Sequence, residues 1–348
     1  MGLPLSKIFG IIVVLAAALT LDACSGLLPK TSPLRSSQPL NGSLVHDLAA
    51  IGSTPGAPML IRIFKQSNEF EVWKGTGGGS MKLFRTYKIC AWSGTLGPKI
   101  VEGDRQAPEG FYNITPGLLN PNSNYYLSFN TGFPNKFDRA WGRTGANLMV
   151  HGDCSSAGCY SMTDQSVSEI YALARETFNG GNNVIQMQIF PFRMTPQNLA
   201  TVAKNSNMPF WMDIKEGYDR FELSKTPPAW DVCEKKYVFD LNGGSTPLDA
   251  TAACPARGND VLTASLSSKE AADNAQLKTL VQQIADRNAK TAAEKQAEAD
   301  AEAAARARGQ AFGGFVSGLL GNGNAQGAQP AGTTTMVAPT PMPAPRGT

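Results

Sequence analysis

A histidine and a cysteine eight residues apart are the side chains of this sequence best suited to covalent chemistry. His151 follows a short apolar run, and Cys159 follows a segment of glycine, serine and alanine. A cysteine becomes a strong nucleophile as its thiolate, and a neighbouring imidazole can take the thiol proton. The only other histidine is His46, which we expect to be exposed and of no chemical importance. The pair therefore favours an acyl-transfer site with Cys159 as nucleophile and His151 as base.

The residues around the cysteine indicate where the charge of a tetrahedral intermediate would be stabilised. Gly158 directly precedes Cys159, and a helix is expected from about Gln165. Loops rich in Gly, Asp and Ser commonly present functional groups. Backbone N–H groups from Gly158 to Tyr160 are therefore candidate oxyanion donors.

Two other interpretations of these residues remain open. His151, Cys154 and Cys159 could supply three ligands to zinc, but a fourth would have to come from a distant segment, and the paired C-x2-C motifs of structural zinc sites are missing. The cysteines could instead be buried structural thiols beside a hydrogen-bonded histidine. We expect neither a metal nor a cofactor.

The segment from His151 to Tyr160 resembles the catalytic motif of YkuD-type L,D-transpeptidases, most closely their YafK-like branch of Gram-negative envelope proteins. That branch carries a compact His-Gly-Asp-Cys and Gly-Cys-Tyr segment, and the similarity extends over roughly residues 59 to 240. The other matching segments, in order, are Cys90-Ala-Trp-Ser-Gly, Leu96-Gly-Pro-Lys99, Ala107-Pro-Glu-Gly-Phe-Tyr112, Asp138-Arg-Ala-Trp-Gly-Arg-Thr-Gly145 and Phe190-Pro-Phe-Arg-Met-Thr195.

The resemblance implies a role for each residue of the motif. Cys159 is expected to be the nucleophile and His151 its base, with the Gly152 carbonyl orienting the imidazole. Amides around Gly158 and Cys159 are expected to hold the oxyanion. The resemblance also implies a substrate, the diaminopimelate-containing stem peptide of peptidoglycan.

The chain departs from the wider family at positions that hold the peptide stem in typical crosslinking members. Those members have a second histidine before the Gly-Cys pair and an arginine soon after it, where this chain has Ala157, Ser161 and Met162. Arginines elsewhere could replace them as a carboxylate clamp; structural salt bridging is the alternative for each. The substrate-binding candidates are Arg139, Arg143, Arg193, Ser155, Ser156 and Tyr160.

The pattern between Met59 and Asp240 predicts a mainly β fold with a few α-helices, an α+β domain. The family resemblance implies that this domain is of the YkuD-like type. Strand-like runs separated by Gly, Pro and Asn turns cover 60–64, 70–73, 81–91 and 125–129. One helix is expected after a capping box formed by Ser166 and Glu169, and another from Thr195-Pro196. The catalytic domain is assigned to residues 59–245.

The N-terminal residues predict export. The apolar run Ile8–Leu21 has 14 residues, short of the roughly 20 that span a bilayer, so residues 1–23 are assigned as a signal peptide. Leu21 to Cys24 resembles a lipobox, from which Asp22 departs; ordinary cleavage or a retained anchor are the alternatives to lipidation of Cys24. Residues 24–58 are expected to be a tether. The predicted location is the periplasm, with a lipid anchor in the envelope.

The C-terminal region predicts little buried structure. Residues 246–267 are assigned as a linker, and residues 268–308, rich in Ala, Glu and Lys, as one long polar helix that acts as a solvated spacer or weak coiled coil. Residues 309–348 are rich in Gly, Gln, Ala, Thr and Pro and are expected to be a disordered tail.

Charge and cysteine content narrow the class of protein. Thirty-one basic against 28 acidic residues leave a net charge of +3, too balanced for electrostatic nucleic-acid binding. Of the six cysteines, four remain once Cys24 and Cys159 are set aside. We favour the pairs Cys90 with Cys154 and Cys233 with Cys254, although four cysteines allow three connectivities.

The residues predict a lipid-anchored cysteine acyl transferase that acts through a thioester. The family resemblance implies that it acts on peptidoglycan stem peptides, with roles in cell-wall biogenesis or degradation and cell shape. If an amine accepts the acyl group, the product is a crosslink or an attached protein. If water accepts it, the enzyme is a hydrolase that releases wall-linked lipoprotein. Expected partners are stem peptides and a wall-linked lipoprotein or outer-membrane protein. The rival from another class is a non-enzymatic wall-binding lipoprotein.

Overall fold

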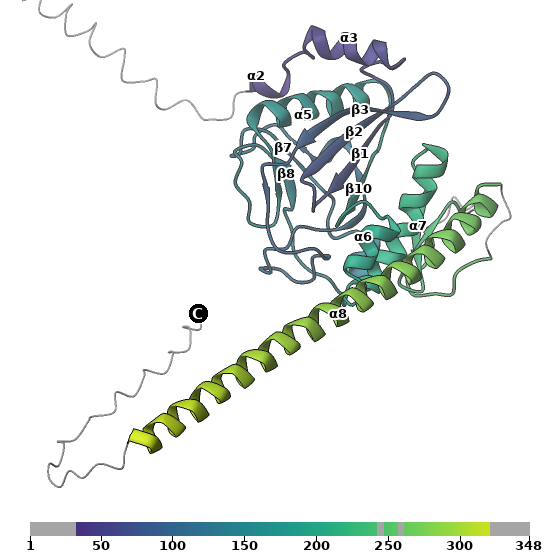
Figure 1. Cartoon of the computed structure of the whole chain (residues 1–348). Helices are drawn as coiled ribbons and strands as arrows, with labels where there is room; N and C mark the ends of the chain where they lie inside the picture. The colour runs from purple at the N-terminus through teal and green to yellow at the C-terminus, as the bar shows by residue number, and fades with distance from the viewer. Residues whose placement is uncertain (1–32, 242–246, 257–260, 321–348) are drawn as a thin grey trace, which may run out of the picture. The chain divides into compact units, whose positions relative to one another are not determined.

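The computed structural model describes residues 33–241, 247–256 and 261–320 (Figure 1). The chain divides into two units, residues 1–284 and 285–348, and the site lies in the first. The predicted signal peptide, Cys24 and residues 321–348 of the predicted tail lie outside the described residues. Within the described ranges, no helix is both long enough and apolar enough to cross a membrane. The mixture of sheets and helices confirms the predicted α+β class.

The larger sheet, called sheet A, is the centre of the domain. Its strand order is β3-β2-β1-β10-β5, with β1 and β10 parallel and the other neighbours antiparallel. Every residue of β1 is buried, because helices or a second sheet cover both faces. The strands are β1 (Met59–Phe64), β2 (Glu69–Gly75), β3 (Met81–Lys88), β5 (Gly110–Ile114) and β10 (Ile185–Phe190).

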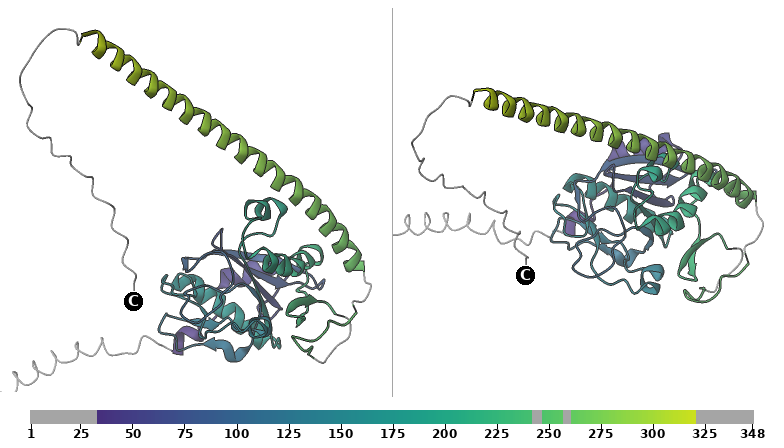
Figure 2. Two further views of the ribbon diagram at one scale, coloured as in Figure 1. Left: turned by 90° about the horizontal axis from the view of Figure 1, so that it is seen from below. Right: turned by 60° about the horizontal axis from the view of Figure 1, so that its bottom comes forward.

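Two hydrophobic clusters pack on the two faces of sheet A. On one face, Ile61 and Ile63 pack with α5 (Asp164–Asn179) and the second sheet. On the other face, Phe64, Phe111 of β5 and Phe190 of β10 pack against α6 (Pro196–Thr201) and α7 (Met208–Ser224). Figure 2 shows these helices from two further directions.

The second sheet, called sheet B, carries the candidate site. Its order is β4-β9-β8-β7-β6, and its only parallel pair is β8 with β9. The strands are β4 (Ala91–Trp92), β6 (Leu119–Asn120), β7 (Ser128–Asn130), β8 (Met149–His151) and β9 (Tyr160–Ser161). The remaining elements are α2 (Pro33–Ser36), α3 (Gly42–Ala50), η2 (Pro116–Leu118), α4 (Lys136–Ala140), β11 (Trp230–Cys233), β12 (Lys236–Phe239) and α8 (Val261–Leu320).

The predicted tether is wrong over its described part, residues 33–58. Asn41 caps α3 through its side chain, and Leu44 and Leu48, one turn apart, are buried against the domain. Further along, the Ser53 hydroxyl donates to the carbonyl of Gly75 on β2. The folded unit therefore begins before the predicted Met59. His46 is exposed on α3, as predicted.

The C-terminal boundaries also need correction. The predicted linker is partly structured, because the turn between β11 and β12 holds residues 250–254 by backbone hydrogen bonds and a disulfide. Helix α8 begins at Val261 rather than 268 and ends at Leu320 rather than 308. Its residues up to Ile284 belong to the first unit, where Leu266 is buried and Lys215 of α7 pairs with Asp273. No proline interrupts residues 261–320, so the glycines after 308 do not end the helix.

Two helical predictions differ in detail from the structure. The N-cap of α5 is Thr163, whose hydroxyl accepts the Ser166 N–H, so the predicted Ser166 capping box is displaced by one turn. The helix at Thr195-Pro196 is confirmed. Helix α7 was not predicted, although Trp211, Ile214 and Phe221 follow helical spacing and are buried on its inner face.

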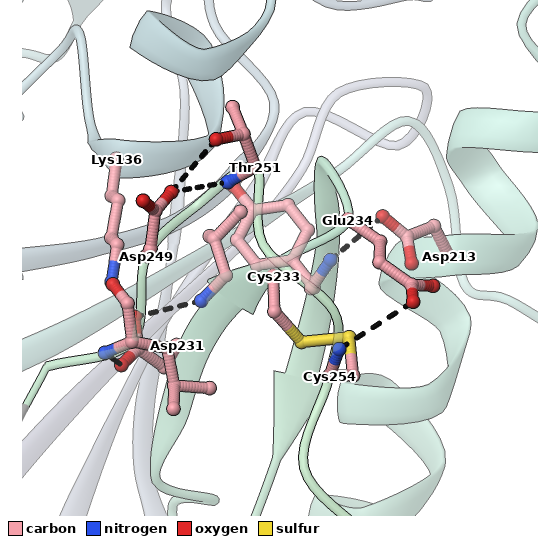
Figure 3. The surroundings of a disulfide bond; sticks show 11 residues. Lys136, Asp213, Asp231, Cys233, Glu234, Asp249, Thr251 and Cys254 are labelled. Carbon is pink, nitrogen blue, oxygen red and sulfur yellow. Dashed lines mark hydrogen bonds and ion pairs between the residues drawn. A yellow bond between two sulfur atoms is a disulfide. The ribbon is translucent and has the colours of Figure 1, made fainter.

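Both predicted disulfides are present. Cys90 is bonded to Cys154 across 64 residues, and Cys233 to Cys254 across 21 residues (Figure 3). In the chain-entropy description, crosslinks closing loops of these sizes contribute roughly 3 to 5 kcal/mol each. Cys159 is the one free cysteine within the described residues.

Candidate active site

The pairing of β8 with β9 brings His151 and Cys159 onto one face of sheet B. His151 ends β8, Cys159 directly precedes β9, and the two strands run parallel with Val150 opposite Tyr160. Val150 and Tyr160 are fully buried in the core. Because side chains alternate along a strand, Met149, His151 and Cys159 face the opposite side from that core. The histidine and the cysteine of the local motif thus lie on the same face of sheet B.

The imidazole of His151 is fixed by its neighbour. Its Nδ1 lies 2.6 Å from the carbonyl oxygen of Gly152. A carbonyl only accepts, so Nδ1 carries the proton and Nε2 of the neutral ring keeps its lone pair. The structure therefore contains the contact expected of Gly152, and it leaves Nε2 free to act as a base.

The aromatic ring of Tyr125 lies against His151. Their ring centroids are 4.7 Å apart at an interplanar angle of 36°, and the histidine is only 4% exposed. Burial lowers the pKa of the imidazole below its ordinary value of 6.5, while the Gly152 carbonyl and the Asp153 carboxylate act in the opposite direction. His151 is therefore neutral at neutral pH.

The Sγ of Cys159 lies against backbone polar groups of the segment that enters β8. It accepts the N–H of Met149 at 3.4 Å, and it lies 3.8 Å from the carbonyl of Asn147. Burial raises the pKa of the thiol, and the Met149 N–H partly offsets this. The resting pair is thus a neutral thiol and a neutral imidazole, so thiolate formation requires transfer of the proton to a base.

The loop between β8 and β9 has an unusual backbone. Asp153 and Cys154 adopt φ of 71° and 45°, and Gly158 adopts φ of 124°, a conformation that favours glycine. The Ser156 hydroxyl donates to the carbonyl of Cys159 at 2.6 Å, and the Cys90 disulfide holds the loop to the segment before β4. Left-handed residues of this kind persist where the surrounding structure fixes them, often at functional sites.

Gly152 lies in a position that no larger residue fits. A Cβ there would meet Asp164 Oδ1 at 2.5 Å and the carbonyl oxygen of Tyr125 at 2.9 Å. The Gly152 N–H donates to that same carbonyl, and Asp164 accepts the N–H of Asp153. The residue thus joins β8, the Tyr125 segment and the first residue of α5.

Replacing Gly152 with alanine is expected to lower the free energy of unfolding by about 1–3 kcal/mol, as overpacking does in tight sites, and to slow alkylation of Cys159 because the His151 ring shifts. Thermal unfolding and iodoacetamide kinetics measure the two effects. Gly77→Ala is the control, because a Cβ at Gly77 meets open space. Equal melting temperatures and equal alkylation rates for the two variants would contradict the packing assigned to Gly152.

The shielding by Tyr125 predicts a second effect. In Tyr125→Ala the imidazole loses part of its burial, which is the largest cause of its lowered pKa, so the His151 pKa should rise towards 6.5, whereas Tyr125→Phe should leave it unchanged. An NMR titration of the two histidines measures this, and the exposed His46 is the internal reference. A His151 pKa that does not move in Tyr125→Ala would refute the shielding.

The substrate-binding candidates lie in different environments. Arg193 pairs with Glu69 and Glu71, which supports the structural alternative, and Arg143 pairs with the buried Asp138 at 2.9 Å. Arg139 is exposed and donates to the carbonyl of Pro134.

The remaining candidates lie in or beside the loop. Ser155 is exposed, whereas Ser156 is half-buried and bonded within the loop. Tyr160 does not fit a substrate contact, because it is fully buried and its hydroxyl donates to the carbonyl of Pro108. The alternative zinc ligand set of His151, Cys154 and Cys159 is excluded, because the sulfur of Cys154 is bonded to Cys90.

Sequence reasoning missed the residues that act through their backbone or come from distant segments. Tyr125 comes from the segment before β7, and the hydrogen bonds of Met149 and Asn147 with Cys159 use main-chain groups. A hydrogen bond from a main-chain group cannot be inferred from residue type, because almost every residue has the same backbone N–H and carbonyl. The strand alternation of β8 could have placed Met149 beside Cys159, but only once the parallel pairing was known.

The comparisons with known proteins give the family. No family model matches the chain. The YafK proteins of Escherichia coli strain K12 and strain O157:H7, whose name places them among the L,D-transpeptidases, are each 42% identical to it over 183 residues, covering 53% of this chain and 74% of each relative.

Solved structures show weaker likeness. The helical cell shape determining protein Pgp2 from Campylobacter jejuni is 21% identical with a TM-score of 0.31, covering 42% of this chain and 54% of that one. Bd1075 from Bdellovibrio bacteriovorus is 19% identical with a TM-score of 0.28, covering 39% and 49%. The chain spans about half the length of these structures. From its 42% identity to YafK over 74% of that protein, the chain belongs to the YafK-like L,D-transpeptidase family.

Proposed function

We propose that this protein is an L,D-transpeptidase that acts on diaminopimelate-containing stem peptides of peptidoglycan through a thioester at Cys159. The observation that carries the proposal is the pair itself. A free cysteine and a histidine share one face of sheet B, with the histidine Nδ1 held 2.6 Å from the Gly152 carbonyl. An intact nucleophile and oriented base favour an enzyme over a non-enzymatic wall-binding lipoprotein.

The reaction proceeds in two acyl-transfer steps. Cys159 Sγ attacks the carbonyl carbon of the amide bond that follows diaminopimelate, and its proton passes to Nε2 of His151. The tetrahedral intermediate collapses as the C–N bond breaks, and His151 returns the proton to the leaving amine. The resulting thioester is then attacked by an acceptor, which loses a proton to His151 and releases the Cys159 thiol. An amine acceptor gives a crosslink or an attached protein, and water gives hydrolysis.

The oxyanion is assigned to backbone N–H groups at Gly158 and Cys159. The positive φ of Gly158 and the hydrogen bond that ties Ser156 to Cys159 support this assignment, because they restrict the backbone around these amides. Preorganised donors of this kind cost no reorganisation when charge develops.

Export to the periplasm is part of the proposal. Two disulfides within the described residues support an oxidising compartment, where such bonds persist. A lipid on Cys24 would hold the enzyme at the envelope, near stem peptides and a wall-linked lipoprotein or outer-membrane protein as partner.

Muropeptide analysis by mass spectrometry tests the reaction and identifies the acceptor. Cells with the protein, cells without it and cells with Cys159→Ala are compared after digestion of the wall. Loss of crosslinked or protein-linked stems in both deficient strains is the expected result. Accumulation of protein-linked stems in those strains would assign the hydrolase activity instead, and identical profiles in all three would overturn the proposal.

A further inference from the structure

A cavity of about 570 Å³ lies beside the segment that leads into β8. Its walls are mostly apolar and aromatic, which is typical of pockets that bind small ligands or peptide side chains. The residues that matter here are Pro98, Ile100, Trp141 and Phe210. Trp141 is 57% exposed, so its large indole ring contacts water. A bound ligand that covers the ring would remove this apolar surface from water.

Two walls of this cavity continue directly to Cys159. From Arg143, on one wall, the chain runs four residues to Asn147, whose carbonyl lies 3.8 Å from the Cys159 Sγ. Four residues span at most about 14 Å. From Ile100, on another wall, the chain runs to Arg105, whose backbone lies 4.0 Å from where a Cβ of Gly158 would be. The thiol and the wall at Arg143 are therefore separated by at most the length of an extended peptide of about five residues, and by less where residues 143–147 are not fully extended.

The third wall is the turn between β11 and β12, which presents Lys235 and Lys236. The indole N–H of Trp141 donates to the Lys235 carbonyl at 2.8 Å, and the Lys235 ammonium lies 5.7 Å from the indole ring centroid. The Cys233–Cys254 disulfide closes this turn (Figure 3), and the N–H groups of residues 234 and 235 donate to the carbonyls of residues 252 and 250. The disulfide thus fixes the cationic wall.

The net charge of the cavity lining is positive. Arg143 is neutralised by Asp138, and the Asp213 carboxylate, which accepts the Tyr237 N–H (Figure 3), brings one negative charge against the two positive charges of Lys235 and Lys236. For Lys235 and Lys236 the structure gives no carboxylate partner among the described residues. An anionic ligand is therefore the one whose charge complements these walls.

We propose that this cavity is a second subsite for the peptide substrate, in which carboxylates of the stem meet Lys235 and Lys236 while its aliphatic portions pack on Trp141 and Phe210. The inference rests on the proposed function. It says which residues bind the parts of the substrate that are remote from the scissile bond. Charge-assisted hydrogen bonds to carboxylates give both affinity and orientation.

Calorimetric titration of a diaminopimelate-containing stem tetrapeptide into the full chain with Cys159→Ala tests the subsite without turnover. Adding Lys235→Gln and Lys236→Gln should weaken binding about tenfold and reduce its salt dependence. Trp141→Ala should weaken it comparably. Lys82→Gln with Lys278→Gln, which removes two exposed lysines that line no part of the cavity, is the charge-matched control and should bind as the parent does.

Two results would overturn the subsite. One is tetrapeptide binding that the Lys235 and Lys236 changes leave intact. The other is a peptide-free wall disaccharide that binds as tightly as the tetrapeptide and loses this binding in Trp141→Ala. That result would assign the cavity to glycan. In a background that retains Cys159, iodoacetamide should react at the same rate with and without the lysine changes. Failure of the proposed function is distinct, because it appears as absence of acylation at Cys159 even where the tetrapeptide binds.

Discussion

Replacing Cys159 with alanine is expected to abolish release of the terminal amine from a stem tetrapeptide. Removal of a covalent nucleophile costs on the order of 10⁶-fold in turnover in acyl-transfer enzymes, because the remaining groups can only bind and polarise the substrate. Chromatographic detection of the released amino acid measures the effect. The fold should survive, since Cys159 is outside both disulfides.

The control for this variant is Ser155→Ala, an exposed residue of the same loop. It is expected to change turnover several-fold at most. Residual turnover in Cys159→Ala within tenfold of the unmodified protein would contradict covalent catalysis by this thiol, whatever the other residues do.

Replacing His151 with alanine is expected to slow alkylation of Cys159 by roughly 10²- to 10⁴-fold at neutral pH, the usual contribution of a general base. The pH dependence gives the sharper result. The lowered pKa of His151 leaves the ring neutral and able to accept a proton above an inflection that lies below pH 6.5. The unmodified protein should therefore lose reactivity only as the pH falls through that inflection.

In His151→Ala that acidic limb should vanish, and reactivity should rise only as the thiol itself ionises. Because burial raises the pKa of Cys159, this rise should occur at a pH above the ordinary range of a free cysteine. His46→Ala, which removes the exposed histidine, is the control and should keep the full profile. An unchanged profile in His151→Ala would exclude the histidine as the base.

The local motif is predictable from sequence because its chemistry and its positioning lie within one short segment. His151, Cys159 and Gly158 follow each other across one β-loop-β unit, so residue type and spacing suffice. The family resemblance implied the contact between His151 and Gly152 for the same reason. Pairing of Cys90 with Cys154 was one of three connectivities, and only the fold selects it.

Interactions that join distant segments were not predictable. Arg193 is paired with Glu69 and Glu71, which are more than 120 residues away in the chain, so no local pattern distinguishes it from a free clamp. Tyr160 could have been excluded, because alternation along β9 turns the residue after Cys159 to the buried face. The error came from weighing its proximity in sequence above the period of the strand.

The predicted boundaries of helices were wrong where a segment's overall composition was given more weight than a short apolar pattern within it. The polar appearance of residues 33–58 concealed Leu44 and Leu48, which suffice to fix α3 on the domain. The glycines after residue 308 suggested a tail, yet Phe312, Phe315 and Leu319 continue the helical spacing to the end of α8. Helix propensity is a weak guide over a few residues, and neighbouring turns can override it.

The measurement that tests the central claim most directly is the intact mass of the purified protein after brief incubation with a stem tetrapeptide and quenching in acid. We expect a covalent adduct with the mass of the acyl stem minus its terminal residue, located at Cys159 by peptide mapping and absent from Cys159→Ala. A protein that stays unmodified while the tetrapeptide is consumed, or an adduct that persists in Cys159→Ala, would contradict the thioester mechanism.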